Sequence, residues 1–170
     1  VVLANGQVDS NPLSESDPEY VFFREALLAV CTELAKMIAR DGEGASKFLE
    51  VRVKGAACEE DARIIARSIA ASSLVKTAIS GEDANWGRVL SAAGASGVPF
   101  DPNLVDVYLG NLMVAADGRG LPFDEERAGA ILRKRDVVIT VDLHKGSALG
   151  IAWGCDLTFE YITINANYRT

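Results

Sequence analysis

The acidic side chain that stands out for chemistry is Glu43, at the centre of the glycine-rich segment 41–45, Asp-Gly-Glu-Gly-Ala. A glycine on each side of Glu43 allows a tight turn from which the carboxylate reaches outward. A carboxylate held in one place can pair with the ammonium group of a substrate. Most acids in surface turns only face solvent, so the residues alone leave both roles open.

A second set of polar side chains lies at the C-terminus, where residues 165–170 include the amide Asn165 and the hydroxyl Thr170. Terminal segments usually fray. This one follows several apolar side chains between residues 159 and 168, which give it area to pack. A docked tail would hold an amide, a hydroxyl and the terminal carboxylate in fixed positions, so the pattern allows a binding site without requiring one.

The third unusual stretch runs from Lys76 to Arg88 and contains two glycines and a tryptophan. Its glycines have the superficial spacing of a phosphate-binding loop. Arg88 stands where that motif has lysine, and Val89 stands where it has serine or threonine, so we reject a nucleotide site. The composition favours a rigid turn whose Trp86 fills the core.

The composition excludes several classes of protein. A chain of 170 residues with 49% hydrophobic and 24% charged residues is globular, and its net charge of −7 disfavours nucleic acid and anionic membranes as partners. No apolar run reaches the length of about 18 residues that a membrane span needs. Three scattered cysteines indicate a reducing, cytoplasmic location, and a single histidine excludes a multi-histidine metal site. We therefore expect no metal and no cofactor.

Hydrophobic periodicity predicts the elements that must position these side chains. Helices are expected over residues 18–40, 59–74, 89–95, 124–132 and 156–164, and strands over residues 49–54, 105–109, 112–115, 137–143 and 147–155. The first helix should bury one face formed by Phe23, Leu27, Val30, Leu34 and Met37. A Gly-Asn turn at Gly110 should close a hairpin. The predicted class is mixed α and β.

The N-terminus, Val1 to Gly6, is typical of the end of a buried strand that runs into a turn. The sequence begins without Met and without a signal peptide. We therefore expect that the native chain continues upstream of Val1.

Three separated motifs carry a family resemblance. They are Lys76-Thr-Ala-Ile with Gly81-Glu-Asp-Ala-Asn-Trp-Gly-Arg88, the turn at 41–45, and Asp156-Leu-Thr with Ile164-Asn-Ala-Asn-Tyr-Arg-Thr170. Together they resemble the ornithine acetyltransferases, also called glutamate N-acetyltransferases, in the same order and over essentially all 170 residues.

The resemblance implies a precursor that cleaves itself before a threonine into an α chain and a β chain. The new N-terminal threonine takes the acetyl group from N2-acetyl-L-ornithine and passes it to L-glutamate, with its own amine available as the base and with oxyanion donors from the α chain. Every threonine of this sequence lies within the chain or at its far end, so none matches that nucleophile. The chain is therefore expected to be the C-terminal part of a β chain, without a catalytic residue of its own.

The resemblance also assigns binding residues and partners. Glu43, Asn165 and Thr170 match the family's substrate-binding positions, whereas the loop from Gly81 to Arg88 receives no role. The expected partners are the α chain, the missing N-terminal part of the β chain, N-acetyl-ornithine and glutamate, in an α2β2 or larger assembly. The expected fold is an N-terminal-nucleophile-like αββα core, of which residues 1–60 form part, followed by a smaller α/β domain over residues 61–170 whose tail returns to the active site.

Two alternatives stay open. A related N-terminal-nucleophile aminopeptidase or amidohydrolase would hydrolyse its substrate without needing glutamate, and a non-catalytic binding or dimerisation domain would form no acyl adduct. The sequence decides neither whether acetyl-CoA is also a donor nor whether the reaction serves arginine synthesis or secondary metabolism.

Overall fold

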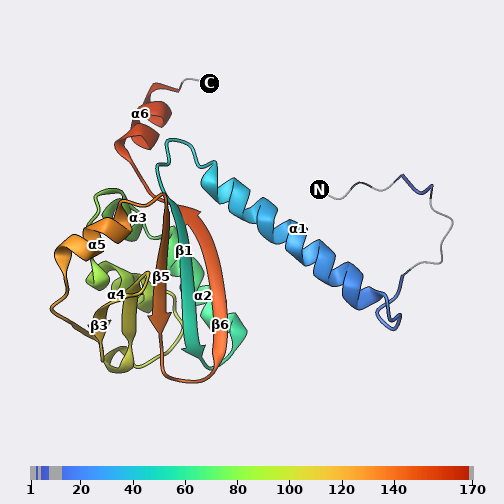
Figure 1. Cartoon of the computed structure of the whole chain (residues 1–170), viewed down its shortest axis with the longest axis horizontal. Coiled ribbons are helices and arrows are strands. Elements are labelled where there is room, and N and C mark those ends of the chain that lie inside the picture. The colour runs from blue at the N-terminus through green and yellow to red at the C-terminus, as the bar shows by residue number, and fades with distance from the viewer. Residues whose placement is uncertain (1–2, 4, 8–12, 169–170) are drawn as a thin grey trace. The chain divides into compact units, whose positions relative to one another are not determined.

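The computed structural model describes residue 3, residues 5–7 and residues 13–168 (Figure 1). The strand expected at the N-terminus depends on Val1, Val2 and Ala4, which lie outside the described residues. Contacts divide the chain into two compact units, Val1–Ala35 and Lys36–Thr170. The second unit contains the sheet and the polar side chains considered below.

Helix α1 (Tyr20–Arg40) forms where the apolar repeat predicts it, but the expected buried face is wrong for this chain. None of its 21 residues is buried. Phe22 is 72% exposed, and even the predicted inward positions Phe23 and Met37 are 53% and 60% exposed. A helix buries an apolar stripe only when it packs against an opposing apolar surface, and the stripe of α1 stays exposed in the described chain.

One mixed sheet organises the second unit. Its six strands, counted in the described part of the chain, lie in the order β4-β3-β2-β5-β1-β6. They are β1 (Phe48–Ala56), β2 (Asp106–Leu109), β3 (Leu112–Ala116), β4 (Arg119–Gly120), β5 (Asp136–Asp142) and β6 (Ala148–Cys155). β1 runs parallel to β5, and the other neighbouring strands are antiparallel. The hairpin predicted around Gly110 is confirmed as β2 and β3, and the short strand β4 follows it.

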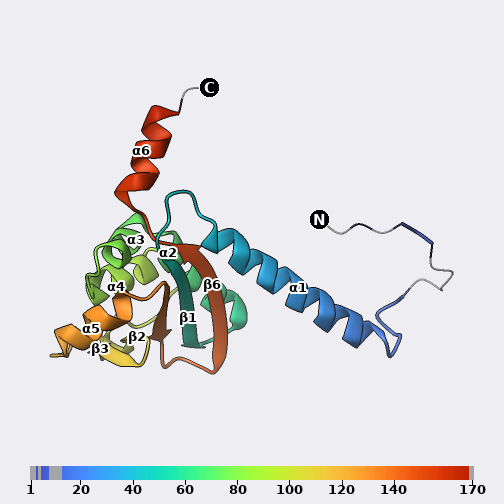
Figure 2. The same ribbon diagram turned by 45° about the horizontal axis from the view of Figure 1, so that its top comes forward.

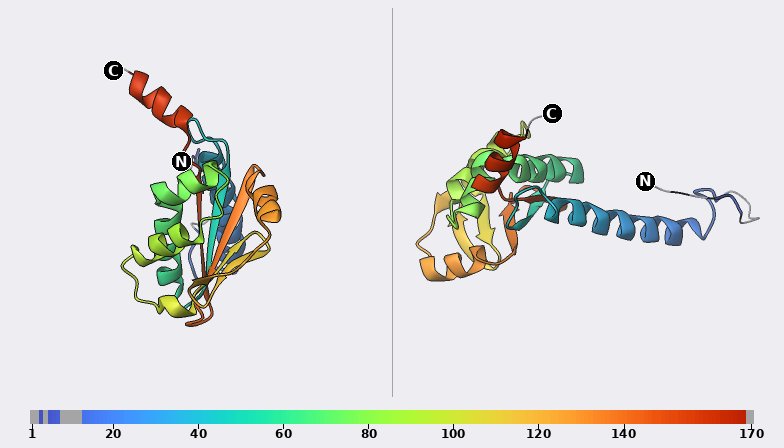
Figure 3. Two further views of the ribbon diagram at one scale, coloured as in Figure 1. Left: turned by 90° about the vertical axis from the view of Figure 1, so that its left-hand side faces the viewer. Right: turned by 90° about the horizontal axis from the view of Figure 1, so that it is seen from above.

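Helices cover both faces of this sheet. They are α2 (Glu59–Ala71), α3 (Ser73–Ser80), α4 (Trp86–Gly94) and α5 (Glu125–Leu132). Helix α6 (Phe159–Asn167) extends from the end of β6 without covering the sheet (Figure 1), and a short 3-10 turn spans Pro102–Leu104. Figure 3 shows α2, α3 and α4 against one face and α5 against the other. The mixed α/β class that the sequence predicts is therefore confirmed.

The single helix predicted from residue 59 to residue 74 is wrong, because Ser72 divides it. Ser72 has the extended ψ of 117°, which ends α2, and its side chain accepts the backbone N–H of Val75 to cap α3. One residue thus ends one helix and starts the next. Leu74, which lies beyond this break in α3, is 59% exposed.

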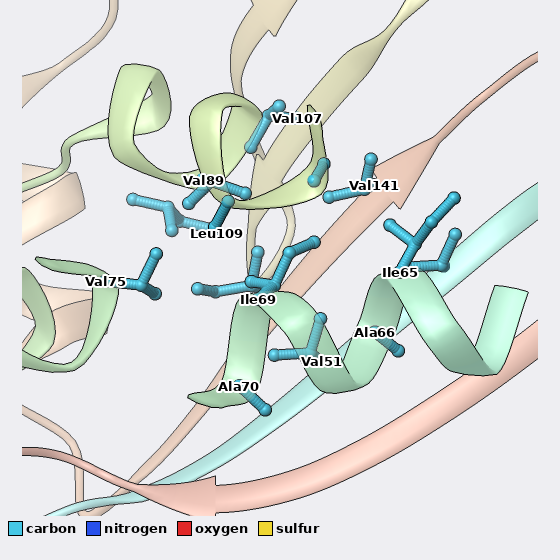
Figure 4. Close-up of a cluster of buried hydrophobic side chains, with 14 of the residues drawn as sticks. Val51, Ile65, Ala66, Ile69, Ala70, Val75, Val89, Val107, Leu109 and Val141 are labelled. Carbon is cyan, nitrogen blue, oxygen red and sulfur yellow. The ribbon is translucent and has the colours of Figure 1, made fainter. Parts of the chain in front are cut away.

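One part of the core lies between α2, α4 and the sheet (Figure 4), and Ala128 and Leu132 of α5 also belong to the core. Leu49, Val51 and Val53 of β1 are fully buried, while Arg52 and Lys54 between and after them are exposed, as the period of two predicts. Ile69 of α2 reaches the middle of the cluster (Figure 4) and is also fully buried.

β1 precedes the domain boundary expected after residue 60, yet it pairs with both β5 and β6 from the second half of the chain. The sheet therefore continues across that position. The division into residues 1–60 and 61–170 stays a prediction.

Gly150 of β6 provides a test of the packing of α2 on the sheet. A Cβ atom at this position would lie 2.5 Å from the backbone of Ala62 and Arg63. We predict that Gly150→Ala destabilises the full-length protein by about 1–3 kcal/mol, because α2 must move away from β6. Thermal and urea unfolding would measure the change.

The matched control is Gly94→Ala at the end of α4, where an added Cβ meets nothing within 4 Å. It should be neutral or stabilising by up to about 1 kcal/mol. Equal losses in the two variants would contradict the close packing of α2 on β6.

Candidate functional site

The candidate site lies at the end of the sheet where β1 begins and β6 ends. Phe48, the first residue of β1, pairs with Cys155, the last residue of β6. The loop 41–47 before β1 and the residues 156–158 after β6 consequently leave the sheet side by side. Figure 2 shows this loop and α6 leaving the same end of the sheet.

A buried carboxylate joins these two segments. Asp156 is only 3% exposed. Its Oδ1 accepts the backbone N–H groups of Ser46, at 2.8 Å, and Lys47, at 3.0 Å. Its Oδ2 accepts the hydroxyl of Ser46 at 2.5 Å. The backbone N–H of Asp156 in turn donates to the carbonyl of Lys47 at 3.1 Å. The carboxylate thus takes its hydrogen bonds from residues about 110 positions earlier in the chain.

Thr158 adds a second tie between the segments. Its hydroxyl donates to the carbonyl of Gly44 at 2.6 Å and also accepts the backbone N–H of Tyr161, which caps α6. Gly44 has a φ of +66°, and a Cβ there would lie 2.6 Å from the Tyr161 nitrogen. Only glycine allows the turn to approach the start of α6 this closely.

The two ties bring together two of the three residues that the sequence assigns to substrate binding. The Nδ2 of Asn165, in the second turn of α6, donates to the Oε2 of Glu43 at 2.6 Å across 122 positions of sequence. Both side chains are exposed. Thr170, the third predicted binding residue, lies outside the described residues, so its assignment stays a prediction.

The hydrogen bonds of Asn165 define what this site offers to a ligand. Its Nδ2 donates to Glu43 and also to the carbonyl of Tyr161 at 2.9 Å. A side-chain amide has two N–H donors, so both are used within the protein. The Asn165 Oδ1 and the Glu43 carboxylate are acceptors, and a cationic group with several N–H donors complements them.

The stretch from Lys76 to Arg88 contacts the end of the same loop through Lys47. The buried side chain of Lys47 donates to the carbonyl of Ile79 at 3.0 Å and to the carboxylate of Glu82 at 3.3 Å. Glu82 has a φ of +57°, so its backbone takes a conformation that few non-glycine residues adopt. This stretch therefore holds the end of the loop that carries Glu43.

Trp86 in the same stretch has the structural role expected from sequence. It starts α4, packs against the core and lies against Gly120, where an added Cβ would approach the indole nitrogen to 2.7 Å. Asn85 caps α4 by accepting the backbone N–H of Arg88. Both side chains therefore serve the packing and capping of α4.

Sequence reasoning missed the residues that hold the site together: Asp156, Thr158 and Lys47. Asp156 and Thr158 belong to a motif of the family resemblance but received no role there. The polar character of Asp156 after a strand is the only local signal, and its partners lie too far away in sequence to be paired without a fold.

A cavity of about 340 Å³ lies between the end of α3 and the start of α6 and is lined mainly by apolar groups around Leu157 and Ile162. Among the described residues, no group of three or more His, Cys, Asp or Glu could hold a metal ion. No described helix combines the length and the apolar character needed to cross a membrane.

A second polar cluster lies at the opposite end of the sheet, around His144. Its Nε2 lies 2.8 Å from the Oδ2 of Asp106, and its backbone N–H donates to Asp142. The bond to Asp106 raises the pKa of His144. Burial pushes the pKa of Asp142 up, but its bond to Lys54 at 2.9 Å and the His144 N–H outweigh burial and hold it below its usual value. The side chain of His144 is 48% exposed.

Comparison with known proteins gives consistent results. The model of the ArgJ family matches residues 1–170. The arginine biosynthesis bifunctional protein ArgJ of Symbiobacterium thermophilum is 53% identical over 170 residues, which are 100% of this chain and 42% of that protein. Its counterpart from Geobacillus kaustophilus is 50% identical with the same coverage. The chain thus spans about two fifths of the length of these curated relatives.

A solved structure supports the fold. The crystal structure of arginine biosynthesis bifunctional protein argJ from Bacillus halodurans superposes with a TM-score of 0.92 at 45% sequence identity. The match covers 99% of this chain and 79% of that chain. At this level of identity the shared fold extends over the whole described sheet and its helices.

The His144 cluster predicts a pH dependence of stability. A histidine whose pKa is raised by folding stabilises the protein fully below its unfolded pKa of about 6.5, and this contribution is lost as the pH rises through the folded pKa. Because the ring is half exposed, the contribution should stay below about 1 kcal/mol. His144→Asn removes the titration and suits the positive φ of 48° at this position.

Urea unfolding of the full-length protein and of this variant at about pH 6 and about pH 8 would measure the effect. The stability difference between the two proteins should shrink at the higher pH. A difference that is constant or grows with pH would contradict the assigned contact with Asp106.

Proposed function

The chain belongs to the ArgJ family, and from that membership we propose that the protein it is part of transfers the acetyl group of N2-acetyl-L-ornithine to L-glutamate through an acyl-threonine intermediate. The relatives it matches are named bifunctional proteins of arginine biosynthesis. In this proposal the chain supplies substrate-binding residues, and the nucleophilic threonine lies outside it.

The observation that carries the proposal is the contact of Glu43 with Asn165 at 2.6 Å. These residues were assigned to substrate binding from two motifs at opposite ends of the sequence, and the fold brings them together. The acceptors they present suit the side-chain ammonium of N2-acetyl-ornithine, which carries a positive charge and three N–H donors.

The proposed reaction has two steps of acyl transfer. The threonine hydroxyl attacks the acetyl carbonyl, forms an ester and releases ornithine as the amine leaves. The amine of glutamate then attacks the ester carbonyl, forms the new amide and returns the threonine hydroxyl. Glu43 and Asn165 would hold the ornithine side chain, so that its acetyl group is presented to the nucleophile.

The proposal includes partners for this chain. An α chain and the preceding part of the β chain would complete the active site, in an α2β2 or larger assembly within the cytoplasm. The exposed apolar side chains of α1, such as Phe22 and Ile38, favour cover by such a partner.

Mass spectrometry of the full-length protein tests this function. After brief exposure to N2-acetyl-ornithine, one added acetyl group should appear on a peptide that begins with threonine, and adding glutamate should remove it as N-acetylglutamate. Repeated release of free acetate without glutamate would favour the hydrolytic alternative, whereas one ornithine per acyl-enzyme is expected from the first step of the transfer itself. The absence of any adduct and of any product would support a non-catalytic domain and would overturn the proposal.

Glu43→Gln tests the role of the carboxylate. Removing the charge keeps the size of the side chain but weakens an ammonium pair, and a charge-assisted hydrogen bond contributes about 1.5–3 kcal/mol. We predict that the KM for N2-acetyl-ornithine rises about 10-fold to 100-fold in the full-length protein. Initial rates at varied donor concentration measure it.

Glu60→Gln is the matched control, because Glu60 is an exposed acid in the first turn of α2. It should leave the KM for the donor within about twofold of the wild-type value, as exposed surface substitutions usually have small effects. An unchanged KM in the Glu43→Gln variant would mean that this carboxylate does not bind the donor.

A further inference from the structure

We propose that Asp156 is the residue that positions Glu43 for substrate binding. This inference rests on the proposed function and adds a residue to which the resemblance gives no role. Asp156 does not reach the substrate itself. It acts through the loop 44–47, whose backbone it fixes against the start of α6.

The burial of Asp156 is the first argument. A carboxylate that is only 3% exposed is stable when hydrogen bonds replace the lost water. Here all three acceptor bonds come from Ser46 and Lys47, the residues that lie between the turn and β1. The buried carboxylate of Asp156 is therefore stable only while this loop stays in place. In return, the carboxylate accepts two backbone N–H groups of the loop that would otherwise be unpaired.

Chain continuity is the second argument. Asp156 lies two residues before Thr158, which caps α6 and bonds the carbonyl of Gly44. The segment 156–158 is thus hydrogen-bonded to the loop at two points, Gly44 and Ser46, on the two sides of Ala45. Asn165 lies on α6, the helix that begins directly after this segment. The hydrogen bonds of Asp156 and Thr158 to the loop therefore set the distance between Glu43 and Asn165.

The third argument is that the fold itself has other support. β1 pairs with β5 from Phe48 to Lys54 and with β6 along most of its length. The side chain of Lys47 is also anchored to Ile79 and Glu82. Loss of the Asp156 carboxylate should therefore free the turn around Glu43 while the sheet stays assembled.

Asp156→Ala in the full-length protein tests the proposal. With the backbone N–H groups of Ser46 and Lys47 unpaired, the turn should shift, and the KM for N2-acetyl-ornithine should rise about 10-fold or more, as misplaced binding groups commonly cause. The acyl-transfer step itself should change less, so kcat should fall by less than about threefold.

Asp106→Ala is the matched control. Asp106 is also a mostly buried carboxylate, with a side chain 13% exposed, and it also accepts a backbone N–H, from Asp117. It lies at the other end of the sheet, so its loss should lower stability without raising the KM. An equal KM rise in both variants would mean that general destabilisation, not positioning, explains the effect.

Asp156→Asn provides a milder variant in case the alanine protein does not fold. The amide keeps one oxygen as the acceptor for both backbone N–H groups, so the KM should stay between those of the wild-type and alanine proteins. A KM above that of the folded alanine variant, or an unchanged KM in every Asp156 variant that folds, would overturn the proposal.

A double-mutant cycle with Glu43→Gln separates positioning from a merely structural role. If Asp156 acts through Glu43, the Asp156 substitution should raise the KM little further once the Glu43 charge is gone. If the double variant raises the KM by the product of the two single effects, the two residues act independently, which would contradict the proposal. If the wild-type protein itself fails to transfer acetyl groups, the proposed function is overturned. If the wild-type protein is active, the KM values of the variants test the role of Asp156 alone.

Discussion

The burial of one carboxylate, Asp156, is the constraint on which the site depends. Moving an ionised carboxylate out of water costs several kcal/mol unless the protein supplies hydrogen bonds in place of water. The backbone and hydroxyl of Ser46 and the backbone of Lys47 supply them. Two segments about 110 residues apart are therefore joined beside the polar ends of β1 and β6. The contact of Glu43 with Asn165 follows from this junction.

The sheet separates two polar clusters with different chemistry. At the start of β1, the exposed groups of Glu43 and Asn165 are acceptors that suit a cation. At the other end, Asp106 and Asp142 already have His144 and Lys54 as their own cations. The first cluster is open to a ligand, whereas the second is satisfied within the chain and supports the fold.

Much of the fold could be predicted from sequence because its signals are local. The alternation in β1, the Gly110 turn and the Asp124 cap of α5 each depend on neighbouring residues. Glu43 and Asn165 could be assigned through the family resemblance.

The remainder depends on contacts that no local pattern contains. Ser72 divides two helices whose apolar repeat continues across it. No residue of α1 is buried, and its apolar stripe alone could not reveal this exposure. The role of Asp156 depends on partners in a distant loop.

The measurement that tests the central claim most directly is a crystal structure of the full-length protein with N2-acetyl-ornithine bound. The account predicts that the side-chain ammonium lies within hydrogen-bond distance of the Glu43 carboxylate and of the Asn165 amide oxygen, with Asp156 still bonded to Ser46 and Lys47. An ammonium bound elsewhere, with Glu43 facing only solvent, would contradict it.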